Sequence, residues 1–205
     1  MNSKYFPTLE KAKDYRDEYR CIPIAREIYS DFITPIQALK ILKNVSRHVY
    51  MLESVENQEK TGRYTFLGYE PKLCITCLNN KIKVIDAKGE VLKEDNIKHP
   101  AVFINETVNE YKSPKIEGMP SFTGGLVGYF AYDYIKYAEP TLNLDAQDEE
   151  KFNDVDLMLF DKVIAFDHFR QKLILIANIR LDNVDAEYAR AEKALGEMRA
   201  LIETG

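Results

Sequence analysis

Short stretches of alternating apolar and polar residues dominate the chain, and this pattern is typical of β-strands that are buried on one face. It predicts nine strands, over residues 21–30, 45–54, 63–69, 72–78, 81–86, 91–94, 124–134, 156–166 and 172–179. The pair Lys88-Gly89 separates two of them and is a hairpin signal. Because many strands alternate with only a few helices, the pattern indicates an α+β fold.

Four segments carry helix signals. Residues 8–20 are polar and rich in charge, and residues 100–111 form a second candidate. Thr34-Pro35 is a helix start, with threonine as the N-cap and proline at the first helical position. The last helix begins after Asn183, and its apolar residues recur every three or four positions: Val184, Tyr188, Ala191, Leu195, Met198 and Ile202. That face could pack in the core, bind a partner or belong to a linker.

The composition narrows the class of protein. Hydrophobic residues make up 45% and charged residues 30% of the 205 residues, as in soluble globular proteins. The net charge of -5 argues against nucleic-acid binding, and no apolar run is long enough for a membrane span. The charged N-terminus is unlike a signal peptide. Together with only three cysteines, these features lead us to expect a cytoplasmic domain without disulfides.

Three motifs with possible chemistry have simpler structural interpretations. Cys74-Ile-Thr-Cys77 could bind zinc or act in redox chemistry, but the pair falls within a predicted strand, where residues three apart face opposite sides. The glycines of residues 124–128 lack the lysine and hydroxyl of a phosphate loop, and they favour a close backbone approach. No triad is evident around the scattered histidines, which are His48, His99 and His168.

The most informative segment is Met51-Leu52-Glu53-Ser54, which is followed eight residues later by Gly62-Arg63-Tyr64-Thr65-Phe66-Leu67-Gly68. It reads as a buried strand, a polar loop and a second strand, with a carboxylate and a hydroxyl where the first strand ends. A glutamate at a strand end is usually a solvated charge. Alternation also puts Glu53 and Ser54 on opposite sides of a regular strand. Both can therefore reach one small zwitterionic ligand only if the strand ends or bulges there.

In their order and spacing, the segments of nearly the whole chain resemble the N-terminal domain of anthranilate synthase component I. The matching segments are Ile22-Pro23-Ile24-Ala25-Arg26-Glu27, Thr34-Pro35, Leu52-Glu53-Ser54, residues 62–68, the glycine-rich strand, the strand pair and the final helix. The resemblance implies mostly antiparallel sheets packed as a sandwich with flanking helices, and residues 1–205 as one domain. Met51 stands where leucine is usual, and such a change conserves volume.

The resemblance also implies a regulatory site for L-tryptophan. Leu52, Glu53, Ser54 and Tyr64 supply the residue types that such a ligand needs, namely an acceptor for its ammonium, donors for its carboxylate and an apolar slot for its indole. Arg63 could face the carboxylate of the ligand. These five residues are the predicted site.

The family converts chorismate to anthranilate and pyruvate with Mg²⁺, and its catalytic motifs belong to a C-terminal domain that we do not find in this sequence. We therefore expect no catalytic residue and no cofactor here. The expected partners are that C-terminal domain, a glutamine amidotransferase subunit and a second copy of the chain. Two alternatives are the equivalent domain of aminodeoxychorismate synthase component I, which also holds tryptophan, and a non-catalytic interaction module.

Overall fold

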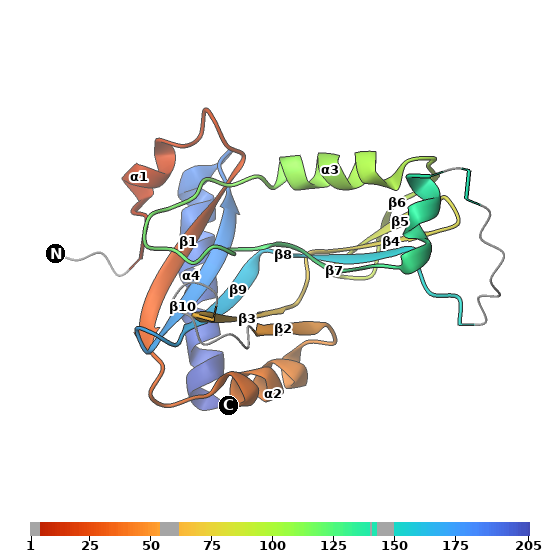
Figure 1. The fold of residues 1–205 in the computed structure, drawn as a ribbon. Coiled ribbons are helices and arrows are strands. Elements are labelled where there is room, and N and C mark those ends of the chain that lie inside the picture. The colour runs from red at the N-terminus through yellow and green to blue at the C-terminus, as the bar shows by residue number, and fades with distance from the viewer. Residues whose placement is uncertain (1–4, 54–61, 140, 143–149) are drawn as a thin grey trace. The chain divides into compact units, whose positions relative to one another are not determined.

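The computed structural model describes residues 5–53, 62–139, 141–142 and 150–205. The chain divides into two compact units. The first contains Met1–Glu70, Glu110–Gly125 and Phe160–Gly205, and the second contains Pro71–Asn109 and Leu126–Leu159. Each unit is built on an antiparallel five-stranded sheet with flanking helices (Figure 1). The predicted α+β class is confirmed.

The first sheet has the order β1 (Cys21–Tyr29), β10 (Lys172–Arg180), β9 (Lys162–Asp167), β3 (Tyr64–Tyr69) and β2 (Val49–Glu53). Neighbouring strands are antiparallel throughout. The expectation that β2 is a buried strand is wrong, because no residue of β2 is fully buried. The strand lies at the edge of the sheet, where one side lacks a neighbouring strand.

One face of this sheet is covered by α4 (Val184–Thr204), together with α1 (Leu9–Lys13) and α2 (Pro35–Val45) (Figure 1). All six apolar residues that the spacing of the last helix predicts are buried in this core. The core interpretation of this helix is therefore confirmed. Asn183 occupies the predicted N-cap position, although its side chain forms no capping hydrogen bond.

The predicted start of α2 is also confirmed. The Gln37 N–H donates to Thr34 Oγ1 at 3.3 Å, and the Thr34 N–H donates to Gln37 Oε1 at 3.0 Å. This reciprocal pair is a capping box, which satisfies two of the donors that a helix leaves free at its start. By contrast, the helix predicted over residues 8–20 covers only Leu9–Lys13, since it has a single buried residue, Ala12, to hold it.

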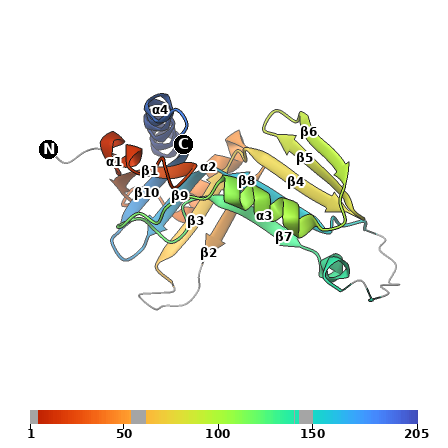
Figure 2. The ribbon, with the colours of Figure 1, turned by 90° about the horizontal axis from the view of Figure 1, so that it is seen from above.

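The second sheet has the order β6 (Val91–Asn96), β5 (Lys81–Asp86), β4 (Leu73–Leu78), β8 (Val155–Phe160) and β7 (Gly125–Phe130). Helix α3 (Pro100–Glu110) lies along it and contributes Ile104 to a core with Ile75, Ile82 and Leu157 (Figure 2). All residues of β6 are exposed, and Lys93, Glu94 and Asp95 give this edge strand charge. No helix in the described part of the chain is long and apolar enough to cross a membrane.

Two predicted strands differ from those observed. Residues 156–166 do not form one strand, because the strand is interrupted at Asp161. β8 belongs to the second sheet and β9 to the first. The strand predicted over residues 124–134 ends at Phe130, and a 3₁₀ helix, η1 (Tyr132–Tyr137), follows it. Asp161 and Lys162 interrupt the apolar residues of the first segment, but two polar residues alone do not show that the next strand joins another sheet.

The structural interpretations of the glycine and cysteine motifs agree with the structure. A Cβ on Gly128 would lie 2.0 Å from the carbonyl oxygen of Asp156, so β7 approaches β8 too closely there for any side chain. The two cysteines lie within β4, with Cys77 buried and Cys74 half-buried. Three residues apart in one strand, they face opposite sides of the sheet.

A buried carboxylate joins three segments of the second unit. Asp154 is 3% exposed and accepts hydrogen bonds from the Asn79 N–H at 2.8 Å, from Lys136 Nζ at 2.7 Å and from the Tyr137 hydroxyl at 2.7 Å. Burial acts to raise the pKa of Asp154, but these three donors outweigh it and hold the pKa below the ordinary value. Asp154 thus fastens η1 to the turn between β4 and β5.

We expect Asp154→Ala to destabilise the second unit by about 2–4 kcal/mol, because it leaves the Asn79 N–H and the Tyr137 hydroxyl without their acceptor. Amide hydrogen exchange of β4 and β5 measures the change. The matched control is Glu106→Ala, at an exposed position of α3 in the same unit. Equal protection in both variants would mean that the Asp154 network contributes nothing to stability.

Candidate functional site

The predicted site residues within the described part of the chain gather at one end of the first sheet. The register of β2 and β3 places Leu52 opposite Phe66 and Glu53 opposite Thr65. Tyr64 begins β3, and Arg63 immediately precedes it. Ser54 lies outside the described residues, so its predicted role stays a prediction.

These residues divide between the two faces of the sheet. Leu52 shares a face with its partner Phe66 and with Tyr64, two residues before Phe66. On this face the Tyr64 and Phe66 rings lie 5.7 Å apart, and Phe122 packs edge-on against Phe66 at 5.6 Å. Leu52 is 45% exposed beside them. This side therefore offers a partly exposed surface suited to an aromatic ligand.

Glu53 lies on the opposite face, next to Thr65. Its side chain is exposed, whereas Thr65 is buried and its hydroxyl lies 2.8 Å from His168 Nε2. The exposed carboxylate lies at the end of β2, and its predicted role as an acceptor for a ligand stays a prediction. Since Leu52 and Glu53 face opposite sides, one ligand can reach both only around the end of β2.

Arg63 forms an ion pair with Asp167, which the sequence analysis did not predict. Its Nε and Nη2 donate to the two carboxylate oxygens of Asp167 at 3.0 and 2.6 Å. Asp167, the last residue of β9, is 1% exposed and also accepts the Arg170 N–H at 3.0 Å. Two of the three guanidinium nitrogens thus hold Asp167, and the predicted contact of Arg63 with a ligand carboxylate stays a prediction.

Aromatic rings flank the same guanidinium. Its central carbon lies 4.9 Å from the centroid of the Tyr64 ring and 5.7 Å from that of Phe169, which are distances of cation–π contact. The His168 N–H donates to the Arg63 carbonyl at 3.0 Å. The turn after β9 is therefore tied to the start of β3 through both backbone and side chains.

Tyr50, the aromatic residue of β2, has a buried hydroxyl group. The Tyr50 ring covers Gly68, where an added Cβ would lie 2.2 Å from a ring carbon, and packs edge-on against Phe160 at 4.7 Å. The Tyr50 hydroxyl is buried and has no hydrogen-bond partner among the described residues. Burial raises the pKa of Tyr50 well above its ordinary value, so the phenol is neutral at physiological pH.

These groups divide between the two sides of β2, with the aromatic side chains beside Leu52 and the exposed carboxylate of Glu53 on the opposite side, while the guanidinium of Arg63 is paired with Asp167. Among the described residues no cluster of side chains could hold a metal ion. The residues that sequence reasoning missed, Asp167, Thr65 and His168, come from pairings between strands distant in the chain. No local pattern in the sequence gives those pairings.

Comparison with known proteins shows the family of this chain. A family profile described as chorismate binding enzyme matches residues 47–201. The chain is 31% identical over 188 residues to "Anthranilate synthase component 1" of Acetivibrio thermocellus, which covers 91% of this chain and 37% of that protein. It is 33% identical over 186 residues to "Anthranilate synthase alpha subunit 1, chloroplastic" of Arabidopsis thaliana, with 84% and 31% covered.

A solved structure agrees with these relatives. The crystal structure of anthranilate synthase component I from Streptococcus pneumoniae matches with a TM-score of 0.50 and 25% identity, over 84% of this chain and 36% of that one. The chain belongs to the chorismate-binding enzyme family. It spans about a third of the length of the curated relatives given above, 37% of one and 31% of the other.

The Arg63–Asp167 pair generates a prediction of pH dependence. Burial acts to raise the pKa of Asp167, but the hydrogen bonds from Arg63 and from the Arg170 N–H hold it below the ordinary value. A carboxyl whose pKa is lowered by folding stabilises the fold above its unfolded pKa, and this contribution is lost as the pH falls through the folded pKa. The pair therefore contributes its stability at neutral pH and loses it in acid.

We expect Asp167→Asn to lower the free energy of unfolding at pH 7 by about 2–3 kcal/mol, because it leaves a half-buried guanidinium without its anion. Urea titrations from pH 7 down to pH 2.5 should show the gap to the unmodified chain closing in acid. Asp17→Asn, at an exposed carboxylate, is the control. A gap that stays constant with pH would contradict a role for the charge of Asp167.

Proposed function

We propose that this chain is the N-terminal, regulatory domain of an anthranilate synthase component I and that it contributes the site at which tryptophan inhibits the enzyme. The observation that carries the proposal is the match of 84–91% of the chain to relatives of that name at 31–33% identity. The order of the segments around Leu52-Glu53-Ser54, which resembles the N-terminal domain of that family, supports the choice of domain.

The arrangement of the first sheet supports the effector site. Glu53 offers an exposed carboxylate for the ammonium of the amino acid, and Leu52 with Tyr64 offers apolar surface for the indole. Ser54, the next residue, would donate to the carboxylate of the ligand or accept from its ammonium. Arg63, held in place by Asp167, adds a positive charge at the same end of the sheet.

In this proposal the conversion of chorismate to anthranilate and pyruvate belongs to the part of the relatives' length that residues 1–205 do not match. The Mg²⁺ of the reaction would be bound there, and this domain would hold no cofactor. A glutamine amidotransferase subunit would supply ammonia as the second component. Tryptophan would act by binding one conformation of the whole enzyme more tightly than another.

In the full-length enzyme, we expect Glu53→Gln and Ser54→Ala each to raise the inhibitory concentration of tryptophan by roughly tenfold to a hundredfold. The reason is that one charge-assisted hydrogen bond contributes about 1.5–3 kcal/mol. Titration of anthranilate formation with tryptophan measures the effect as the ratio of inhibited to uninhibited turnover.

Glu18→Gln, at an exposed carboxylate of the same unit, serves as the control and should keep the inhibition of the unmodified enzyme. If Glu53→Gln and Ser54→Ala were inhibited like this control, Leu52-Glu53-Ser54 would not be the effector site. If they lost turnover instead, these residues would belong to catalysis or folding.

Residues 1–205 alone should form no anthranilate from chorismate and ammonia in the presence of Mg²⁺, because the proposal assigns the reacting groups to the part of the relatives that these residues do not match. The fluorescence of anthranilate provides a sensitive assay, and a reaction without protein sets the background. Turnover above that background would sink the assignment of this chain as a regulatory domain.

A further inference from the structure

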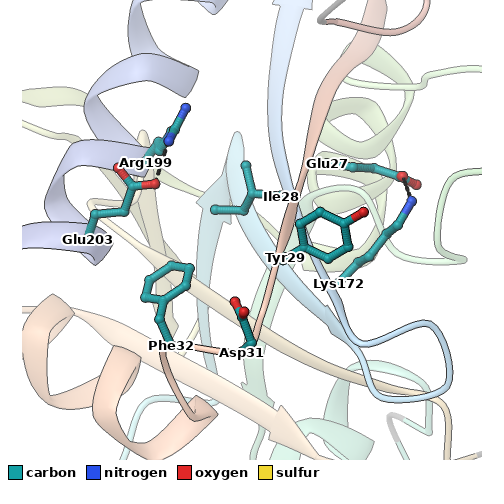
Figure 3. A pocket seen from close by; sticks show the side chains of 8 residues that line it. All are labelled: Glu27, Ile28, Tyr29, Asp31, Phe32, Lys172, Arg199 and Glu203. Carbon is teal, nitrogen blue, oxygen red and sulfur yellow. Dashed lines mark hydrogen bonds and ion pairs between the residues drawn. The ribbon is translucent and has the colours of Figure 1, made fainter.

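A concave site lies in the first unit, at the end of β1. It is a cavity of about 500 Å³ between the end of β1, the segment before α2, the start of β10 and the last turns of α4 (Figure 3). Its lining residues are Glu27, Ile28, Tyr29, Asp31, Phe32, Lys172, Arg199 and Glu203. None of them belongs to the predicted effector site.

One carboxylate of this cavity, that of Asp31, has no ion-pair partner among the described residues. Lys172 Nζ binds Glu27, and Arg199 Nε binds Glu203, each at 2.5 Å (Figure 3). Asp31 makes no hydrogen bond or ion pair with any residue that the structure describes. Glu27 also accepts from Arg170 Nη1 at 2.9 Å, so each of these cations is already paired, and Asp31 is the carboxylate of the cavity that has no partner among the described residues. An anion would have to break an existing ion pair to bind here, whereas a cation meets a free acceptor.

The apolar residues of the cavity are unusually open to solvent. The side chain of Tyr29 is 73% exposed and that of Phe32 is 46% exposed, although both are large aromatic residues. Half-buried Ile28 lies between Tyr29 and the Arg199–Glu203 pair (Figure 3). Aromatic faces beside a carboxylate attract organic cations, and the methylenes of a long basic side chain can cover such apolar surface.

We propose that this cavity binds a lysine or arginine side chain of a partner polypeptide, with the cation on Asp31 and the stem against Tyr29 and Phe32. The net charge of -5 favours a basic partner over a second copy of this chain, since two copies repel each other at long range. The proposal is independent of the function proposed above, because it uses neither the effector residues nor the identity of the enzyme.

The test uses the 205-residue chain and a blocked tripeptide with a central lysine, followed by NMR shifts of the Tyr29, Asp31 and Phe32 amides. We expect saturable binding with a millimolar dissociation constant. Asp31→Asn and Tyr29→Ala should each weaken binding by about threefold to fivefold, the range of an exposed ion pair or cation–π contact. Both positions are exposed, so the variants should fold, and circular dichroism verifies this.

Three controls decide the outcome. The same tripeptide with its lysine acetylated should not bind, and Glu18→Gln should bind the lysine peptide as the unmodified chain does. Equal binding of the acetylated peptide, or equal weakening by Glu18→Gln, would overturn the proposal. If n-butylammonium bound as tightly as the peptide, the cavity would be a site for small amines, and the assignment to a polypeptide would be wrong.

Discussion

The first unit depends on a carboxylate that is placed where water cannot reach it. Asp167 ends β9 with 1% of its surface exposed, and a charge in that position is costly unless it is paired and hydrogen-bonded. Arg63 and the Arg170 N–H satisfy it. The start of β3 and the turn of residues 168–171 are therefore fixed to each other, and the predicted effector residues take their places from that pairing.

The same turn also connects the two sites described above. Arg170 donates its backbone N–H to Asp167 and, through Nη1, a hydrogen bond of 2.9 Å to Glu27. Glu27 in turn holds Lys172 at the wall of the cavity beside β1. A continuous series of ion pairs, joined by the one hydrogen bond from the Arg170 backbone N–H to Asp167, thus runs from Arg63 to that cavity. Contiguity of this kind is compatible with coupling between the sites, but only measured coupling energies establish it.

How far the sequence predicts the structure depends on the range of the interaction. The buried face of α4, the cap at Thr34 and the close approach at Gly128 follow from local spacing or from one residue type, and the structure contains all three. Three other features do not follow from local sequence, because each depends on which distant strand becomes the neighbour. They are the edge position of β2, the interruption of the strand at Asp161 and the pairing of Arg63 with Asp167. The sequence places Glu53 at a strand end, and alternation puts the adjacent Leu52 and Glu53 on opposite sides, but the sequence could not show that this strand lies at the edge of the sheet.

The two outer strands of the second sheet differ in a way that matters for the behaviour of the chain in solution. β6 carries Lys93, Glu94 and Asp95, whereas β7 has no charged residue and leaves Tyr129 and Phe130 41% and 50% exposed. Charged side chains on an outer strand oppose the addition of another strand. Aggregation during refolding should therefore begin at β7, and a lysine introduced there would act as a gatekeeper against it.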